Sequence, residues 1–328
     1  MERREFLALA IVGMILLGLP AVVLGYQYWL RPTLAPGRVI DIEAAIPENG
    51  GLQPDAIEVQ VGETVTLRFA SLDVTHGIAI GPGLSIDLGH IDPGEVKEIT
   101  LTFDKPGVYT YYCNSWCSPN HWRMRGVIQV VDPAQSLYVP QLDPVIEALI
   151  AEGVDIDAKH SADTSHASPM VIQPSISRGA TLAETLVKPA ELDDIEWRRT
   201  HTPAQAVDLL AATNPGVTQA ELVDVVFYWW SSSPPNAVAQ ELYAKNCAAC
   251  HGETGGGDGP AADTTVEKPV AFADAVYMFE RRSDVFYAKI RRGGMGTDMP
   301  NFGTIFTPEE TWALVDYLWS FPVAEPTD

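Results

Sequence analysis

The four cysteines of this 328-residue chain are confined to two short segments, 113–117 and 247–250. Each pair is followed closely by a histidine, His121 after the first pair and His251 after the second. Thiols and imidazoles at such spacing are common donors of metal and cofactor sites. Because two such sites would use all 4 cysteines, none is left for a disulfide. The chain is therefore expected to fold around two separate cofactor sites.

The first segment, CNSWCSPNHWRM, brings two thiols, an imidazole and a thioether into one run that ends at Met124. Soft sulfur ligands together with imidazole favour copper among the metals that proteins bind. A mononuclear blue-copper site needs only one cysteine, so Cys113 and Cys117 suit a pair of copper ions bridged by both sulfurs. One histidine would bind each ion, His121 and the distant His76, with Met124 and a backbone carbonyl as weak ligands.

A zinc site is the alternative for the same segment, because Cys113, Cys117, His121 and one more histidine make a tetrahedral set. Such a site has no use for Met124, which stands three residues after the histidine. His90 is another histidine of this region, and we expect it to lie in an exposed loop rather than to bind metal. We therefore interpret the segment as a copper site.

The second segment, CAACH, has the C-x-x-C-H spacing of c-type haem attachment. Cys247 and Cys250 would add to the two vinyl groups of one haem, and His251 would bind its iron. A thioredoxin-like redox pair is the alternative, but nothing here resembles its βαβ context and it leaves the histidine unexplained. A second axial ligand is expected from RRGGMGTDMPNFG, where we favour Met299 over Met295. With methionine and histidine both bound, the haem would suit electron carriage and would not bind oxygen.

Different folds are expected around the two segments. From about residue 40 to 132, runs such as AIEVQVGETVTLRFA and VKEITLTF alternate apolar and polar residues, with proline and glycine turns between them. This pattern predicts an all-β sandwich of roughly 100 residues. The final run TPEETWALVDYLWSF is typical of an amphipathic helix. Residues 237–322 are therefore expected to form a small helical domain that is complete in itself.

An uncharged apolar run, Phe6–Gly25, is about as long as a helix needs to cross a hydrocarbon core of roughly 30 Å. Tyr26, Tyr28 and Trp29 follow it and suit a membrane interface. We interpret the run as a single transmembrane helix. A cleaved signal peptide is the alternative, but its apolar part is normally about 7 to 15 residues long and ends at a small-residue site. Haem is attached to such a motif outside the cytoplasmic membrane, so the soluble domains are expected on the outer, periplasmic or extracellular, face.

The chain is acidic, with 21 Lys and Arg against 43 Asp and Glu and a formal net charge of −22. This balance argues against a nucleic-acid partner and against an anionic-lipid surface, both of which need basic patches. It suits the steering of a basic soluble electron carrier, and solubility alone is the alternative explanation.

The middle of the chain, residues 136–236, contains no cysteine. Its part Asp157–Pro174 is rich in Ser, Ala, His and Asp and is typical of a flexible linker. His160, His166 and Met170 lie in this linker, where we expect them to be solvated rather than bound to metal.

A faint internal repeat follows the linker. TQAELVDVVFYWWS at 218–231 aligns with TPEETWALVDYLWS at 307–320 at one constant offset, and both are typical of amphipathic helices. The middle of the chain is therefore either a cytochrome-like helical unit that carries no haem, or it contains an unrelated aromatic helix.

The first soluble part resembles the binuclear copper (CuA) domain of subunit II of haem-copper oxidases. The resemblance covers about residues 52–131 and rests on S-x-D-V-x-H, a later Pro-Gly, Gly-x-Tyr before the loop, and the loop pattern C-x-x-x-C-x-x-x-H-x-x-M. It implies copper ligands from His76, Cys113, Cys117, His121, Met124 and the carbonyl oxygen of Ser115. Many family members have Glu where Ser115 stands, and because that residue contributes its carbonyl, serine is compatible with the site. Many family members have Gly where Ser118 stands, and the Ser118–Pro119 pair departs from that pattern.

The C-terminal part resembles class I c-type cytochromes, in which a Met-Pro-x-Phe loop supplies the distal ligand, here Met299. The expected fold is therefore multidomain: one N-terminal transmembrane helix, an all-β cupredoxin sandwich and an all-α cytochrome c domain. We place a membrane anchor at 1–35, the cupredoxin CuA domain at 36–135, a linker and possible haem-less helical unit at 136–236, and the cytochrome c domain at 237–328.

The combination resembles subunit II of a cytochrome c oxidase with a fused cytochrome c domain, and the single anchor helix resembles the B-type oxidases. The resemblance implies an electron-entry subunit of the respiratory chain. Electrons from an external donor, such as a soluble cytochrome or cupredoxin, would pass from haem c to CuA. They would then pass to subunit I in the membrane, where oxygen becomes water, so no catalytic oxygen site is expected in this chain. The equivalent subunit of a copper-containing nitric oxide reductase and a free-standing membrane electron carrier are the alternatives.

Overall fold

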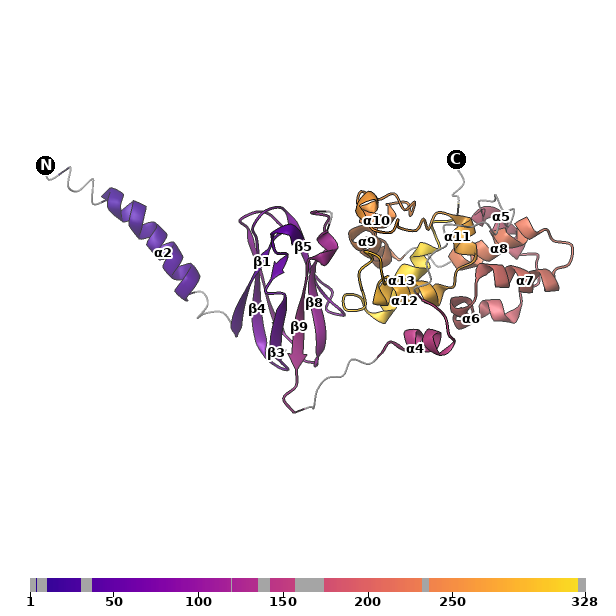
Figure 1. Cartoon of the computed structure of the whole chain (residues 1–328), viewed down its shortest axis with the longest axis horizontal. Helices are drawn as coiled ribbons and strands as arrows, with labels where there is room; N and C mark the ends of the chain where they lie inside the picture. The colour runs from indigo at the N-terminus through magenta and orange to yellow at the C-terminus, as the bar shows by residue number, and fades with distance from the viewer. Residues whose placement is uncertain are drawn as a thin grey trace.

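Three parts follow one another along the longest axis of the molecule: an isolated N-terminal helix, a β-sandwich and a helical region (Figure 1). The computed structural model describes Arg4 and residues 11–30, 37–118, 120–134, 142–156, 174–231 and 236–323, without the side chain of Gln27. The β-sandwich and the helical region lie side by side (Figure 1). This order agrees with the predicted succession of an apolar helix, a β domain and a helical cytochrome.

The N-terminal helix is regular but changes its hydrogen-bonding pattern along its length. It contains the π-helical turns η1 (Met14–Gly18) and η2 (Tyr26–Leu30) on either side of α2 (Leu19–Gly25). Ile11–Leu30 has a mean hydropathy of 1.8 and is long and apolar enough to cross a membrane. Its apolar side chains are exposed, as a lipid-facing helix requires. Length and composition would equally suit a signal sequence, so the anchor stays a prediction, and residues 6–10 of the predicted span lie outside the described residues.

The β domain is a sandwich of two sheets, as the alternating pattern predicts. The first sheet has the order β2-β1-β4-β7 and the second β3-β9-β8-β5-β6. Their strands are β1 (Arg38–Ala44), β2 (Leu52–Gln53), β3 (Ala56–Gln60), β4 (Thr64–Ser71), β5 (His76–Gly81), β6 (Ile86–Ile91), β7 (Val96–Thr102), β8 (Gly107–Cys113) and β9 (Arg125–Val131). Short 3-10 turns occur at η3 (Pro47–Asn49) and η4 (His121–Arg123). Because β5, β8 and β9 are neighbours, the loops at one end of the second sheet meet.

Alternation within the strands separates a core face from an outer face. Ile78, Ile80, Tyr111 and Ile128 are almost fully buried and belong to the core between the sheets. The intervening residues of the same strands point to the other face of the second sheet, because successive side chains of a strand alternate. That outer face is the one on which the helical region lies.

The helical region begins after the sandwich. Its elements are α4 (Pro144–Ala151), α5 (Ile176–Ala183), η5 (Ala190–Asp193), α6 (Ile195–Thr200), α7 (Pro203–Thr213), α8 (Gln219–Ser231), α9 (Ala237–Asn246), α10 (Ala248–His251), η6 (Ala262–Thr264), α11 (Ala275–Phe279), α12 (Ser283–Arg292) and α13 (Pro308–Leu318). The predicted linker residues His160, His166 and Met170 lie outside the described residues. The described parts of the middle segment contain α4 and the helices α5 to α8, joined by turns.

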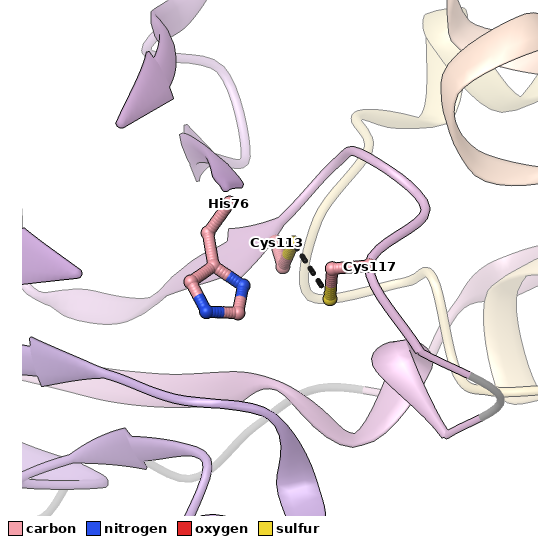
Figure 2. A group of neighbouring side chains, drawn as sticks. All are labelled: His76, Cys113 and Cys117. Carbon is pink, nitrogen blue, oxygen red and sulfur yellow. Dashed lines mark hydrogen bonds between the residues drawn. The ribbon is translucent and has the colours of Figure 1, made fainter. Parts of the chain in front are cut away.

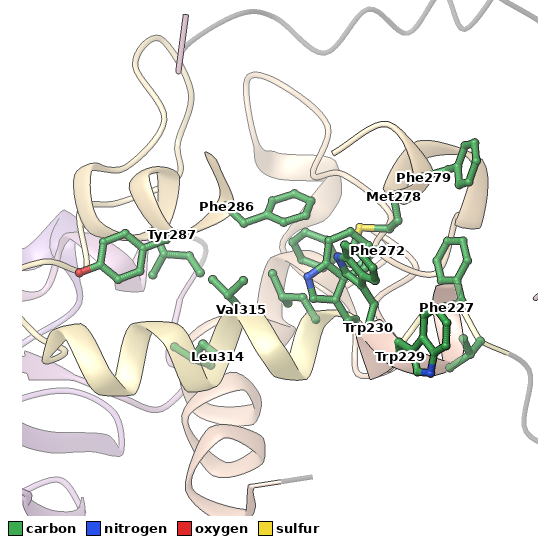
Figure 3. Packing of buried hydrophobic residues seen from close by; sticks show 14 of the residues in the cluster. Phe227, Trp229, Trp230, Phe272, Met278, Phe279, Phe286, Tyr287, Leu314 and Val315 are labelled. Atoms are coloured by element: carbon green, nitrogen blue, oxygen red, sulfur yellow. The ribbon is translucent and has the colours of Figure 1, made fainter. Parts of the chain in front are cut away.

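The middle helices and the C-terminal helices share one hydrophobic core. Phe227 of α8 stacks near Phe279 of α11 at 6.4 Å between ring centroids, and Trp230 of α8 meets Trp319 edge to face at the same distance. Figure 3 shows Phe227 and Trp230 in the same cluster as Phe272 and Phe286. The described helices of the middle segment therefore pack in one core with the C-terminal helices.

The faint repeat corresponds to two helices with the same N-terminal cap. Thr218 and Glu221 exchange side-chain to backbone hydrogen bonds before α8, and Thr307 and Glu310 do so before α13. This reciprocal arrangement is a capping box. The sequence match thus marks a shared helix start, while the interpretation of the middle segment as a cytochrome-like helical unit without haem stays a prediction.

Candidate metal centre and haem site

Both cysteines of the first segment lie at one end of the second sheet. Cys113 is the last residue of β8, and Cys117 lies in the loop that follows it (Figure 2). Their Sγ atoms are 3.8 Å apart and both thiols are free. Met124 is fully buried, and its Sδ is 3.4 Å from Cys117 Sγ. The sulfur atoms of Cys113, Cys117 and Met124, all from the connection between β8 and β9, therefore lie close together.

Of the two predicted histidine ligands, His76 belongs to the tight group with both thiols, and His121 lies outside that group but contacts Cys113. His76, the first residue of β5, is held beside Cys113 because β5 and β8 are paired from Ile78 and Cys113 onward. The ligand atoms of His76, Cys113 and Cys117 all lie within 4.8 Å of one another. The Nδ1 atoms of His76 and His121 are buried and have no hydrogen-bond partner. Buried nitrogens normally have partners, so two lone imidazole nitrogens beside two thiols indicate a site built for metal.

The backbone around Ser115 belongs to the same cluster. Cys113 Sγ lies 3.1 Å from the carbonyl oxygen of Ser115. The Oγ of Ser115 lies 2.9 Å from Nε2 of His90. His90 is exposed, as predicted, but it is in strand β6 rather than in a loop. The loop prediction failed because the apolar alternation of β6 covers only Ile86 and Leu88 and stops at Gly89.

Asp73 orients one of the histidines, a role that the sequence analysis did not assign. Its Oδ1 lies 2.9 Å from Nε2 of His76. Asp73 is itself fixed by hydrogen bonds from Ile46 N–H, Val74 N–H and the Asn49 side chain. The signal was present in the motif S-x-D-V-x-H, which places a carboxylate three residues before the histidine.

The protonation of the cluster follows from its crowding. The hydrogen bond with Cys117 lowers the pKa of the Cys113 thiol to about 3, against the opposing effect of burial. The same contact, together with burial, raises the pKa of Cys117. Burial disfavours protonation of His76, but its contacts with Cys113 and Asp73 outweigh burial and raise the pKa of the imidazole. One thiolate is thus already stable without metal, and the second thiol would lose its proton to a bound cation.

The donor set fits copper better than zinc. A structural zinc site uses four nitrogen, sulfur or carboxylate donors. Here a buried thioether and a backbone carbonyl are within 3.4 Å of a cysteine sulfur, in addition to two thiols and two imidazoles. Thioether together with thiolate and imidazole is a donor combination that suits copper.

The second cysteine pair lies where α9 meets α10. Cys247 caps the end of α9, and its carbonyl accepts hydrogen bonds from the N–H groups of Cys250 and His251 at 3.1 and 2.9 Å. This single turn brings Cys250 and His251 back towards Cys247. The arrangement follows from the C-x-x-C-H spacing, because residues three and four apart lie on one face of a helical turn.

His251 is oriented for binding through one ring nitrogen. Its Nδ1 lies 3.1 Å from the carbonyl oxygen of Val270, and its ring stacks on Phe272 at 4.7 Å between centroids. A carbonyl contact at Nδ1 fixes the tautomer with the proton there and leaves Nε2 as the free donor. Burial lowers the pKa of His251, so the imidazole is kept neutral.

The two thiols near His251 are protonated in this environment. Burial raises the pKa of Cys247 to about 12 and also raises the pKa of Cys250. Both groups would therefore act as neutral thiols, the form from which addition to a vinyl group delivers both sulfur and hydrogen. The residues fit covalent haem attachment with an imidazole axial ligand.

The methionine loop closes around Met299 rather than Met295. Met299 is half-buried and packs on the hydrophobic core, whereas the Met295 side chain is 70% exposed. The N–H of Gly294 donates to the Met299 carbonyl at 3.1 Å. Gly293 has φ +80°, and a Cβ there would lie 2.8 Å from the same carbonyl. The glycines thus allow the chain to fold tightly around Met299.

Comparison with known proteins agrees with both sites. Residues 52–131 match the family described as "Cytochrome C oxidase subunit II, periplasmic domain", and residues 237–322 match the family "Cytochrome c". Cytochrome c oxidase subunit 2 of Thermus thermophilus is 37% identical over 81 residues, which are 24% of this chain and 58% of that protein. Nitrous-oxide reductase of Stutzerimonas stutzeri is 35% identical over 81 residues, 23% of this chain and 12% of that enzyme.

The chain covers less than two thirds of the length of these relatives. Among solved structures, the periplasmic domain of subunit II of cytochrome oxidase from Bradyrhizobium japonicum is 22% identical and covers 29% of this chain and 84% of that one. Its TM-score is 0.24.

Proposed function

Because the chain carries a cytochrome c oxidase subunit II periplasmic domain and a cytochrome c domain, we propose that it is the electron-entry subunit of a terminal oxidase. Electrons would be received at haem c, passed to a binuclear copper centre and delivered to subunit I for the reduction of oxygen. The observation that carries the copper part is the pair of partnerless buried Nδ1 atoms, on His76 and His121, beside two thiols 3.8 Å apart.

The copper pair would be held by the six groups of the cluster. Cys113 and Cys117 would bridge the two ions, and His76 and His121 would each bind one of them. Met124 and the Ser115 carbonyl would be the weak ligands; these groups lie 3.4 and 3.1 Å from a cysteine sulfur. When bound, the pair supplies a one-electron carrier. Its ligands are held by loops and strand ends at one end of a rigid sheet, which favours little movement on a change of charge.

The haem would be attached through Cys247 and Cys250, with His251 and Met299 as axial ligands. The His251 contact with the Val270 carbonyl and the exposure of Met295 support this choice. A methionine–histidine pair raises the haem potential, and filling both axial positions leaves no place for oxygen. The chain would therefore carry electrons without reducing oxygen itself.

The other partners follow from the N-terminal helix and the charge. The helix that ends at Leu30 would anchor the chain in lipid beside subunit I, with the two cofactor domains on the outer face of the cell membrane. A net charge of −22 would attract a basic soluble donor, such as a cytochrome or cupredoxin, and argues against nucleic acid.

The test is purification from the native membrane in mild detergent, followed by haem and copper analysis and by oxygen uptake with a reduced donor. We expect a complex with additional haems that consumes oxygen. Consumption of nitric oxide alone would assign the chain to a nitric oxide reductase. Recovery of a solitary chain with one haem and two coppers would identify a free-standing carrier and overturn the oxidase assignment.

A further inference from the structure

The two candidate sites are joined across the contact between the sandwich and the helical region. The joining row on the sandwich is formed by Ala79, Tyr112 and Arg125, which are cross-strand neighbours on β5, β8 and β9. Ala79 and Tyr112 are buried in the hydrophobic cluster of the helical region rather than in the sandwich core. The outer face of the second sheet is therefore covered by the chain's own cytochrome domain.

Arg125 links the copper loop to the methionine loop. It follows Met124 directly, and its guanidinium donates to the carbonyl of Asn301, two residues after Met299. Its Nε also donates to the Trp122 carbonyl at 3.0 Å, which fixes the copper loop from within. The guanidinium lies 5.2 Å from the centre of the Phe302 ring. One rigid, planar side chain thus contacts both loops at once.

A second link lies near the cysteine end of the haem site. Lys245, two residues before Cys247, pairs with Asp87 of β6 at 2.5 Å. The same Asp87 oxygen accepts a hydrogen bond at 3.1 Å from Asn114, the residue after Cys113. The methionine loop around Met299 therefore contacts the segment of Met124, and the segment of Cys247 contacts, through Asp87, the segment of Cys113.

Gly81 lets the two domains approach closely. A Cβ at this position would lie 2.1 Å from the carbonyl oxygen of Ile305, in the loop that follows Met299, and its three nearest neighbours would all be Ile305 backbone atoms. The added methyl group would therefore meet the cytochrome domain and not the sandwich core. A substitution of Gly81 by alanine would therefore push the two domains apart without placing any atom in the copper site or the haem site.

We propose that Arg125 and Asp87 are positioning residues that dock the chain's own cytochrome domain onto the outer face of the copper domain, so that the two cofactors exchange electrons across a fixed contact. The inference rests on the proposed function. In the transfer, one electron is lost at the haem iron and one is gained at the copper pair, and no bond or proton changes place. The competing arrangement is a cytochrome domain that swings freely and meets the copper domain at random.

The first measurement is hydrogen exchange of residues 79–81 and 301–307 in the full chain as purified, which reports opening of the contact without reference to activity. We expect Gly81→Ala to accelerate exchange there by roughly fivefold to a hundredfold, the range for overpacking. Asp87→Asn should accelerate it by roughly two- to fivefold, as for a part-exposed ion pair. Glu63→Gln is the matched control, because Glu63 pairs with Arg38 within the sandwich at 2.9 Å.

The second measurement is the rate of haem-to-copper transfer in the holo chain after flash reduction of the haem by a ruthenium polypyridyl photoreductant with a sacrificial amine. Gly81→Ala and Arg125→Met should slow the transfer, and Arg125→Lys should restore part of it, because lysine can reach one carbonyl but not both. The double variant Lys245→Gln with Asp87→Asn should slow the transfer no more than Asp87→Asn alone. Both substitutions remove the same ion pair between the two domains.

Normal transfer in the unmodified chain, with exchange and rate unchanged in Gly81→Ala and Asp87→Asn, would overturn the docking proposal while leaving the proposed function intact. Failure of the proposed function has another signature, which is the absence of any haem-to-copper transfer in the unmodified chain. Faster exchange in the variants would still support the docked contact in that case.

Discussion

Oδ1 of Asp73 lies 2.9 Å from Nε2 of His76, which leaves Nδ1 as the nitrogen that faces the sulfur atoms. A carboxylate in this position holds the ring in place and makes it a better donor, and loss of such a partner costs roughly 10- to 100-fold in metal affinity. Asp73→Ala is therefore expected to weaken copper binding by that factor. Competition with a copper chelator, followed in the visible spectrum, measures the change.

Asp41→Ala is the control for this prediction, because Asp41 is on the other sheet and pairs with Arg68. It should leave copper affinity unchanged. Equal copper retention by Asp73→Ala and the unmodified chain would show that the carboxylate does not orient a ligand.

Changing one cysteine of the copper site should destroy the binuclear centre and spare the haem. In Cys113→Ser the bridging sulfur is lost, so we expect the mixed-valence spectrum of the copper pair to disappear. The haem should stay attached, because Cys247 and Cys250 belong to another domain. Electron paramagnetic resonance and the haem absorption band measure the two sites in the same sample, and an intact binuclear signal would contradict the bridging role.

Much of the candidate site could be predicted from local spacing. The C-x-x-C-H turn and the loop from Cys113 to Met124 place their donors within one helical turn or one hairpin end, where sequence distance limits spatial distance. His76 was proposed because the copper pair needs a second imidazole, and the family motif supported it; its approach to Cys113 depends on pairing of β5 with β8 and could not be derived from local spacing. Contacts such as that of Arg125 with Asn301 join residues far apart in the chain. They produce no periodic pattern in the sequence, so they could not be predicted from it.

The middle of the chain was the hardest part to interpret from the sequence. The possible haem-less helical unit stays a prediction, but the burial of Phe227 and Trp230 against the C-terminal helices was not predicted. Amphipathic patterning shows that a helix has a buried face, but it does not show which partner covers that face.

Met299 and Met295 can be separated by their effects on the haem. Met299→Ala should lower the reduction potential, since loss of the thioether removes the ligand that raises it, and should open the iron to external ligands such as cyanide. Met295 is 70% exposed, so Met295→Ala should change neither property. Potentiometric titration followed at the haem bands makes the comparison, and the reverse pattern would transfer the axial role to Met295.

The shared core predicts that the middle helices stabilise the haem domain. Trp230 is 6% exposed and meets Trp319 edge to face, so Trp230→Ala removes a large buried ring from the contact between α8 and the residue that follows α13. Truncation of a buried aromatic costs about 3–5 kcal/mol of the free energy of unfolding. If α8 and the haem domain form one cooperative unit, this loss must appear in thermal unfolding followed at the haem absorption band, although Trp230 lies outside the matched cytochrome segment 237–322.

Val266→Ala, at a residue that is 79% exposed within the haem domain, is the control and should leave the transition in place. An unchanged haem transition in Trp230→Ala would mean that the middle helices unfold independently.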